Sequence, residues 1–177
     1  RRVLFRYIVC ASSRGLGQAC AASLAREGVH LTLNARGAED LERTATELAD
    51  SFDVSVHYVV GDIGDDETRA ALIEACIEPD ILVNNNGGPA PGRFRDWTRD
   101  DWVAAFDANM IAPTLMIQAV IDGMVERKFG RIVNITSAMV KQPFSAMGLS
   151  TSARSALTAL NKAVSKDVVR HNVTMNN

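Results

Sequence analysis

The chain has 177 residues and a formal net charge of −2, and 47% of its residues are hydrophobic and 23% charged. These values are ordinary for a globular protein, and a chain of this length can bury a core as one domain, residues 1–177. A net charge this close to neutral gives no electrostatic case for nucleic acid or an anionic membrane, so we expect neither as a partner.

The cysteines, the histidines and the apolar runs indicate the cellular compartment of the protein and whether it binds metal or spans a membrane. Cys10, Cys20 and Cys76 show no CxxC spacing and indicate buried thiols in a reducing compartment, and the scattered histidines predict no metal site. No apolar run approaches the roughly 20 residues that a membrane span needs, and no signal-peptide pattern is present. We therefore expect a cytoplasmic protein.

Strand-like and helix-like segments alternate along the chain. The predicted strands are VLFRYIVC (3–10), HLTLNA (30–35), VSVHYVV (54–60), DILVNN (80–85), GRIVNIT (130–136) and the start of a sixth in HNVTMNN (171–177). Apolar residues at helical spacing lie between them, with the longest helices expected over 97–127 and 151–168. This alternation predicts an α/β fold, a doubly wound parallel sheet with helices on both faces. Because the chain stops within the sixth strand, we expect a further strand and a substrate-covering segment to be missing.

The segment CASSRGLGQA (10–19) connects the first strand to the first helix. Gly15 and Gly17 lie where the backbone must turn sharply and come close to a ligand. The helix that follows presents free N–H groups and the positive end of its dipole to a diphosphate. In an alternating α/β chain this position predicts a dinucleotide site.

The same segment resembles the glycine signature TGxxxGxG of the classical short-chain dehydrogenase/reductase family, most closely the 3-oxoacyl-acyl-carrier-protein reductase branch. Gly15 and Gly17 match, whereas Cys10 stands for the Thr and Ala11 for the first Gly. The Ala11 departure is mild if its φ is negative and serious if it is not. The resemblance covers essentially all 177 residues and implies a Rossmann-like fold.

The end of the second strand, LNAR, indicates which dinucleotide is bound. NAD-binding sheets place a carboxylate there for the ribose 2′-hydroxyl, but this chain has Ala35 and Arg36. A guanidinium can bind a 2′-phosphate bidentately, and Arg14 could supply a second cation. We predict NADP(H) as the cofactor; the alternative is that both arginines are solvated surface residues.

Further cofactor contacts are implied by the resemblance. Asp62 in GDI matches the family's adenine-contacting Asp, and Asn84 in NNNGG matches the first Asn of NNAG, with Asn86 in the place of Ala. The full set of expected cofactor-binding residues is Ala11, Ser13, Arg14, Gly15, Leu16, Gly17, Arg36, Asp62, Ile63, Asn84 and Gly87.

The resemblance also implies hydride transfer between nicotinamide and a carbonyl or alcohol carbon, through an Asn, a Ser, a Tyr and a Lys. Asn109 in DANMIAP matches the Asn, and Ser137 in NITSAM matches the Ser. The YxxxK motif falls on Ser150 and Arg154 in STSAR. The expected catalytic set is therefore Asn109, Ser137, Ser150 and Arg154.

This catalytic set lacks a strong proton donor. An aliphatic hydroxyl is a much weaker acid than a phenol, and an arginine cannot give up a proton. The only tyrosines, Tyr7 and Tyr58, fall in strands one and three. Loss of the general acid should lower the rate by about 10²–10⁴-fold. Lys141 could replace the donor, although a surface lysine is the commoner case.

Pro113 follows Asn109 by four residues. Proline has no N–H, so the helix should kink there and leave the Asn109 carbonyl facing the cleft and hydrated. The alternative is that Pro113 simply begins a second helix after a break.

Two functions remain open. The first is an NADP-dependent oxidoreductase that reduces a 3-oxoacyl-like carbonyl with an altered proton donor. The resemblance then implies a homodimer or homotetramer, and Arg93, Arg95 and Arg99 could contact an acidic acyl carrier. The second is a non-catalytic NADP-binding protein with a sensing or assembly role. A methyltransferase on a similar sheet would need an acid near the end of the second strand, which LNAR lacks.

Overall fold

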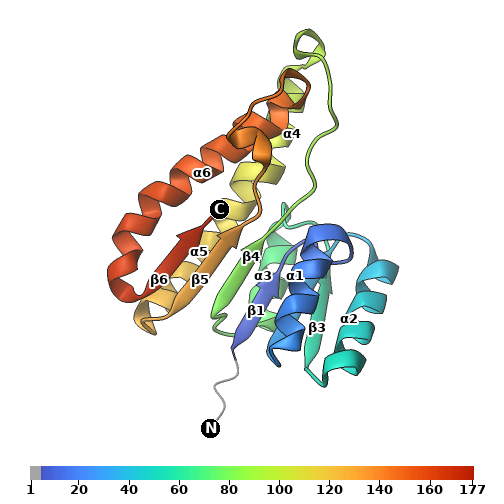
Figure 1. The fold of residues 1–177 in the computed structure, drawn as a ribbon, viewed down its shortest axis with the longest axis vertical. Coiled ribbons are helices and arrows are strands. Elements are labelled where there is room, and N and C mark those ends of the chain that lie inside the picture. The colour runs from blue at the N-terminus through green and yellow to red at the C-terminus, as the bar shows by residue number, and fades with distance from the viewer. Residues whose placement is uncertain (1–4) are drawn as a thin grey trace.

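The computed structural model describes residues 5–177. Six parallel strands form one sheet in the order β3–β2–β1–β4–β5–β6 (Figure 1). The strands are β1 (Arg6–Val9), β2 (His30–Ala35), β3 (Val56–Val60), β4 (Ile81–Asn84), β5 (Gly130–Asn134) and β6 (Val173–Asn176). The predicted doubly wound sheet is confirmed, and residues 3–4 of the first predicted strand lie outside the described residues.

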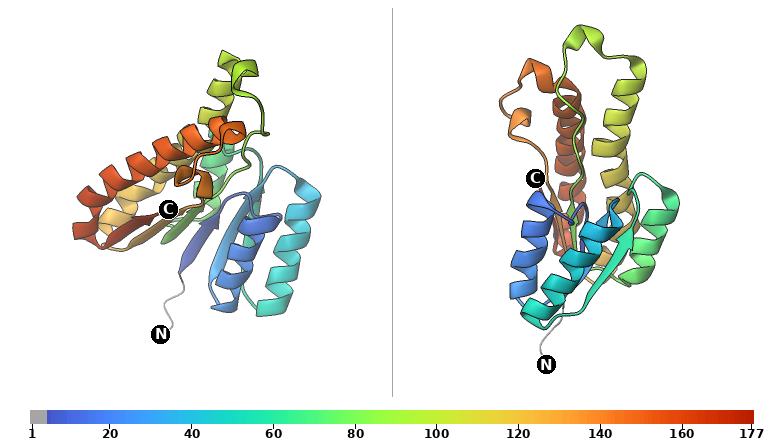
Figure 2. Two further views of the ribbon diagram at one scale, coloured as in Figure 1. Left: turned by 45° about the horizontal axis from the view of Figure 1, so that its top comes forward. Right: turned by 90° about the vertical axis from the view of Figure 1, so that its right-hand side faces the viewer.

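The helices are α1 (Gly15–Arg26), α2 (Ala38–Phe52), α3 (Asp66–Ala75), α4 (Arg99–Phe106), α5 (Ala112–Glu126) and α6 (Gly148–Val168). Helices α1 and α2 cover one face of the sheet, and α3, α5 and α6 pack on the other, as the two views of Figure 2 show. Successive side chains of a strand point to opposite faces, so Ile8 packs with the second group of helices and Val9 with the first. Both faces of β1 are therefore covered, which explains its apolar run.

The strand order changes direction between β1 and β4. Chain order runs outward from β1 through β2 to β3, then restarts on the other side with β4. Loops leaving the carboxyl ends of β1 and β4 therefore diverge and leave a crevice, which is where ligands of such sheets bind. This places the glycine segment 10–17 and the loop after β4 on opposite sides of one opening.

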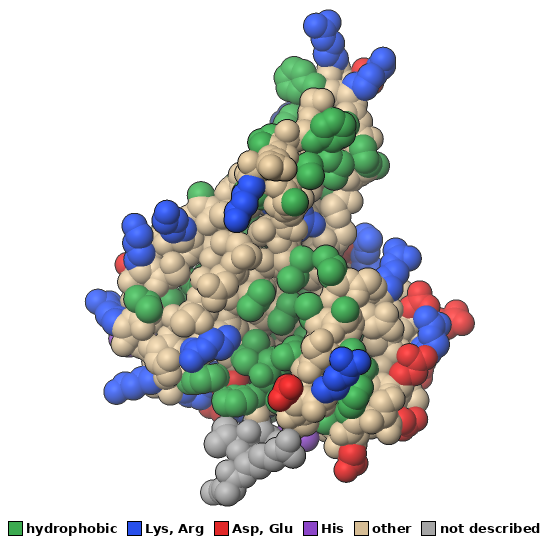
Figure 3. Space-filling model, viewed as in Figure 1, with side chains coloured by type: hydrophobic (Ala, Val, Ile, Leu, Met, Phe, Trp, Pro, Cys, Tyr) green, Lys and Arg blue, Asp and Glu red, His purple; other side chains and the backbone are tan. Residues whose placement is uncertain are grey.

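The segment between β4 and α5 rises away from the sheet (Figure 1). Its outer end is packed around Trp97, whose ring meets the rings of Phe94 and Trp102 edge-on. Gly92 and Gly148 leave room for the indole, because a Cβ on either would lie 2.6 or 2.7 Å from it. Lys or Arg side chains lie at the tip of this projection (Figure 3). Trp97 and Trp102 are half-buried and Phe94 is exposed, so these rings form a small aromatic cluster at the surface of the projection.

The helical stretch Arg99–Glu126 corrects one expectation. Within residues 5–177 it is the one helix whose length and composition would suffice to cross a membrane. Its second half, however, buries Met116, Val120 and Met124 in the cluster beneath the sheet. One helix of this kind is weak evidence of a membrane span, because the core helix of a soluble protein passes the same test.

Candidate active site

The glycine segment closes tightly at the start of α1. Gly15 has a φ of 60°, and a Cβ on Gly17 would lie 2.1 Å from the Ala11 carbonyl oxygen. The backbone N–H and the hydroxyl of Ser12 both donate to the Asn34 carbonyl, at 2.9 and 3.2 Å, and fix the loop to β2. Only glycine fits at position 17, as the sequence predicts.

The backbone conformation of Ala11 decides between the two cases that the sequence left open, a negative or a positive φ. Its φ is 47°, in the left-handed region that favours glycine. The departure from the glycine signature at this position is therefore the strained case, not the mild one.

A cavity of about 460 Å³ opens above the carboxyl ends of β1 to β4. Eight of the predicted cofactor-binding residues line it: Ala11, Ser13, Arg14, Leu16, Arg36, Asp62, Ile63 and Gly87. Gly15 and Gly17 belong to the loop between these lining residues. Sequence reasoning missed the contributions of Asn34, Asn85 and Asp40, although the run NNN after β4 was a visible signal.

Asn84 does not line the cavity. Its side chain is buried at the end of β4, where its amide group donates to the Pro113 carbonyl at 3.2 Å and to Asn134 Oδ1 at 3.0 Å. The Asn134 amide in turn donates to Asn161 Oδ1 on α6, at 3.0 Å. In this arrangement Asn84 joins β4 to α5 and β5, and its cofactor contact stays a prediction.

Two arginines, Arg14 and Arg36, are the cations that line the cavity, together with the carboxylates of Asp40 and Asp62. Arg36 follows β2 directly, and its guanidinium lies 3.6 Å from the Asp62 carboxylate across the opening. Arg14, just before α1, is exposed and has no ion pair with any of the described residues. No acid stands at the end of β2 itself, where Ala35 is buried.

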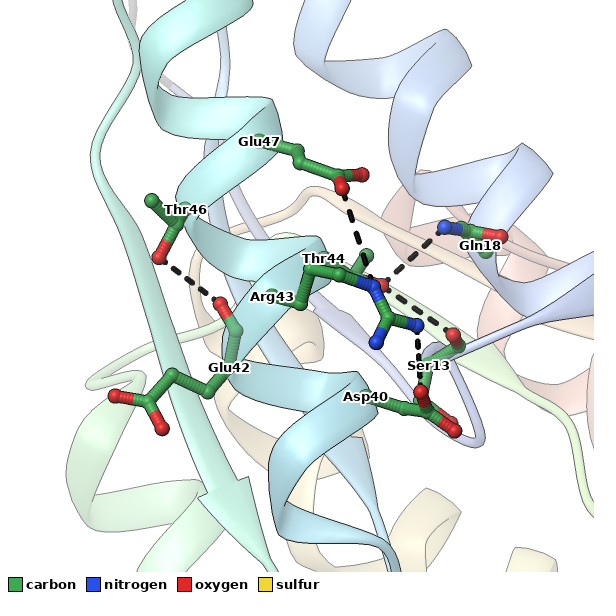
Figure 4. A network of polar contacts seen from close by, with 8 residues as sticks. All are labelled: Ser13, Gln18, Asp40, Glu42, Arg43, Thr44, Thr46 and Glu47. Carbon is green, nitrogen blue, oxygen red and sulfur yellow. Dashed lines mark hydrogen bonds and ion pairs between the residues drawn. The ribbon is translucent and has the colours of Figure 1, made fainter.

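The nearby carboxylate of Asp40 is held by Arg43, and this contact raises the pKa of the guanidinium (Figure 4). In the same network, Thr44 donates to the Ser13 carbonyl at 3.3 Å and accepts from Gln18 at 3.3 Å (Figure 4). Helix α2 therefore fixes the glycine loop through Thr44, and its Arg43 partly neutralises the negative charge of Asp40 beside the cavity.

A second cavity, of about 440 Å³, adjoins the first and shares Arg36 and Gly87 with it. Asn109 lines it from the junction of α4 and α5, together with Trp97 and Leu149. The two cavities together form a cleft along the ends of the strands.

Asn109 lies in a π-helical turn, Asp107–Ile111, where the N–H of Ala112 donates to the Asp107 carbonyl. The predicted disturbance of the helix thus takes the form of a π-turn immediately before Pro113, and such turns are frequent at functional sites. The Asn109 amide donates to the Ala105 carbonyl at 3.4 Å, and its Oδ1 is buried without a partner among the described residues. Hydration of the Asn109 backbone carbonyl stays a prediction.

Ser150 and Arg154 lie one turn apart at the start of α6, and both are buried. Arg154 Nε donates to Ser150 Oγ at 3.3 Å, and the guanidinium also donates to the carbonyls of Ile135 and Asn86, at 2.6 and 2.9 Å. Burial lowers the pKa of Arg154 from its ordinary value. The side chain thus ties α6 to the ends of β4 and β5.

Ser137 begins a short 3₁₀ turn after β5, and its Oγ accepts from the Met139 N–H at 3.1 Å. It follows Thr136, whose carbonyl accepts from Arg154 at 3.4 Å. Lys141 is exposed on the same loop. Ser137 is therefore next in sequence to a residue whose carbonyl accepts from Arg154. None of Ser137, Ser150 and Arg154 lines either cavity.

Neither tyrosine approaches the cleft. Tyr7 is buried in the core cluster beneath α1 and α2, where burial, with Asp80 and Glu27, raises its pKa. Tyr58 is exposed on the edge strand β3. Within residues 5–177, no group of three or more His, Cys, Asp or Glu side chains could hold a metal ion.

Comparison with known proteins agrees with this geometry. The family profile described as short chain dehydrogenase matches residues 6–177, and the chain belongs to this family. The NADPH-dependent reductase BacG of Bacillus subtilis is 31% identical over 173 residues, which cover 95% of this chain and 67% of the relative. The inactive hydroxysteroid dehydrogenase-like protein 1 of Homo sapiens is 35% identical over 141 residues, 77% of this chain and 43% of that protein.

Among solved structures, L-sorbose reductase from Gluconobacter frateurii, complexed with NADPH and L-sorbose, superposes with a TM-score of 0.90. Its sequence identity is 26%, and the match covers 96% of this chain and 66% of that chain. The chain spans two thirds or less of the length of most of these relatives.

Proposed function

We propose that the chain binds NADP(H) along the cleft and transfers hydride between this cofactor and a small carbonyl or alcohol substrate. The observation that carries the proposal is the closed glycine loop at the mouth of α1, where a Cβ on Gly17 would meet the Ala11 carbonyl. Such a loop lets backbone N–H groups reach a diphosphate. The descriptions of two of the three proteins compared above name NADPH, which supports the cofactor.

The residues present fit a 2′-phosphate. Arg14 and Arg36 line the cavity, and the absence of an acid at the end of β2 removes the usual partner of a free ribose 2′-hydroxyl. Asp62 and Ile63 line the same cavity beside the position expected for adenine. Calorimetric titration tests this directly: NADPH should bind at least about tenfold more tightly than NADH, a difference of about 1.4 kcal/mol. Failure of both nucleotides to bind at about 1 mM would end the proposal.

In the bound state, NADPH supplies the hydride and the protein supplies the orientation. We assign the hydroxyls of Ser137 and Ser150, which lie outside the lining of both cavities, to the substrate oxygen. Asn109 lines the second cavity from the π-turn. Ser137→Ala should therefore reduce turnover without weakening NADPH binding. Unchanged turnover would remove Ser137 from the site.

The finer part of the proposal is a weakened proton donor. Ser150 and Arg154 stand where the family resemblance places a tyrosine and a lysine, and no tyrosine reaches the cleft. The double variant Ser150→Tyr with Arg154→Lys should gain activity toward ketones if only the acid is missing, by up to about 10²-fold. The single variant Ser150→Tyr is the control, because it keeps the arginine.

A 3-oxoacyl substrate presented by an acidic carrier protein is the substrate that the branch resemblance suggests. Of the three arginines on the projection, Arg93 is paired with Asp96 at 2.6 Å, and Arg99 lies 4.0 Å from Asp100. Arg95 has no such pair among the described residues and is the strongest candidate contact. Charge reversal at Arg95 should abolish carrier-protein binding, and unchanged binding would limit the substrate to free small molecules.

A non-catalytic NADP-binding protein is the second candidate, favoured by the lack of a strong acid at the site and by the 35% identity to a relative named as inactive. Tight NADPH binding without oxidation of NADPH by a panel of ketones would select it. For either function we propose a cytoplasmic protein that forms a homodimer or homotetramer. Sedimentation analysis would test the oligomeric state.

A further inference from the structure

The guanidinium of Arg154 is a buried cation without an acidic neighbour. The residue is 8% exposed, and no carboxylate of the described residues lies within ion-pairing distance of it. Burial is also the only influence on its pKa, whereas a nearby acid would have raised that pKa. A buried charge is costly unless it is paired, and backbone carbonyls offset only part of that cost. The site therefore carries an unused capacity to bind negative charge.

Two donors at this site remain free. A guanidinium has five N–H groups, and those of Arg154 go to Ser150 Oγ, to the carbonyls of Ile135 and Thr136, and to the carbonyl of Asn86. One N–H of Nη2 is left without an acceptor among the described residues. Ser150 Oγ accepts from Nε, so its own proton is available for another acceptor.

Gly88 shows where these two donors converge. A Cβ placed on Gly88 would lie 3.5 Å from Ser150 Oγ and 3.8 Å from Arg154 Nη2. Gly88 also lines the cavity of about 440 Å³. Ser150 and Arg154 do not themselves line this cavity, so an oxygen atom from the cavity reaches the two donors by passing Gly88.

We propose that the Ser150 hydroxyl and the Arg154 guanidinium form a charged oxyanion site, which stabilises negative charge on the substrate oxygen without transferring a proton to it. The inference rests on the proposed function. As hydride adds to the carbonyl carbon, the π electron pair moves to the oxygen, and the resulting alkoxide accepts hydrogen bonds from Ser150 and Arg154. The alkoxide then takes a proton from water, and hydroxide leaves to solvent. The carbonyl is reduced to the alcohol, and NADPH is oxidised to NADP⁺.

The first test uses formate as a stand-in for the oxyanion, in the cofactor-free protein. Titration with sodium formate should shift the Arg154 Nε–Hε resonance in ¹⁵N NMR spectra, with the resonance assigned from its loss in Arg154→Lys. Ser150→Ala and Gly88→Ala should each weaken formate binding severalfold. The Gly88→Ala methyl would make ordinary contact with Ser150 and Arg154, so this variant should fold. Its methyl group should only occupy the space through which formate reaches the two donors. Lys162→Met, which removes an exposed cation from the same helix, should leave the titration unchanged.

The second test is the pH dependence of carbonyl reduction. Neither a serine hydroxyl nor an arginine titrates between about pH 6 and pH 9, so kcat/KM should stay flat across that range. The double variant Ser150→Tyr with Arg154→Lys should instead lose activity on the basic side, because its phenol must be protonated to act as an acid. Ser150→Ala should lower kcat by about 10²-fold with NADPH affinity unchanged.

The outcomes separate this inference from the proposed function. A formate shift at Arg154 together with a flat profile supports the oxyanion site. No formate shift, or a basic limb in the unmodified protein, would overturn it while leaving NADPH-dependent reduction in place. Absence of NADPH binding would remove the proposed function, and the oxyanion site with it.

Discussion

Replacement of Ala11 by glycine is expected to stabilise the protein. Ala11 has a φ of 47°, and a left-handed conformation costs a non-glycine residue about 1–2 kcal/mol. Glycine removes that strain but gives the unfolded chain more freedom, which costs about 0.4–1 kcal/mol. The difference leaves a net gain of about 0–1.6 kcal/mol with a midpoint of about 0.8 kcal/mol, and for a chain of this length the midpoint raises Tm by about 2–3 °C.

Thermal unfolding followed by circular dichroism measures the effect, with Ala35→Gly as the matched control. Ala35 is buried in β2 and has no positive φ, so glycine there brings only the entropic cost and a lost methyl contact. Its Tm should fall while that of Ala11→Gly rises. If both variants lose stability equally, the strain assigned to Ala11 is not present in the protein.

Three further predictions concern the same cleft. Gly17→Ala places a Cβ 2.1 Å from the Ala11 carbonyl, so NADPH binding measured by calorimetry should be lost; retained binding would show that the loop can open. Arg36→Gln should weaken NADPH binding about tenfold and leave NADH binding nearly unchanged, since only NADPH carries the 2′-phosphate; equal losses would argue against that contact. Burial raises the pKa of the Cys10 thiol to about 12, so at about pH 8 iodoacetamide should modify the half-buried Cys20 first in mass spectra, and equal labelling would contradict the burial of Cys10.

The parts of the fold that follow from local sequence could be predicted, and those that depend on distant contacts could not. The strand HLTLNA has the predicted limits, His30–Ala35, because its apolar run and its flanking breaks are local signals. The φ of Ala11 depends on how the loop closes against Gly17, which spacing alone does not reveal. The buried amide chain from Asn84 through Asn134 to Asn161 on α6 joins residues that are 50 and 27 positions apart in sequence.

The candidate site shows the same division. The motif positions of Ser150 and Arg154 were readable, but the use of the guanidinium was not, because its acceptors are backbone carbonyls on two other loops. The sequence likewise predicted a disturbance at Pro113 without its form, since a π-turn and a simple break have the same local signal. Gly88 was missed because a glycine beside prolines normally indicates only a loop.

In the proposed site, a serine and an arginine suit one another for a physical reason. A phenol with its ordinary pKa of about 10 is a weak acid near neutral pH, and a neighbouring cation that lowers this pKa makes it a better one, so a tyrosine works best beside a cation. A serine hydroxyl does not titrate in that range, and the cation beside it can then act only by attracting negative charge. For that task arginine is better than lysine, because a buried ammonium readily gives up its proton, whereas a guanidinium keeps its charge and has a fixed donor geometry. The carbonyls of Asn86 and Ile135 orient the plane of Arg154 before any substrate arrives, which is the preorganisation that electrostatic catalysis requires.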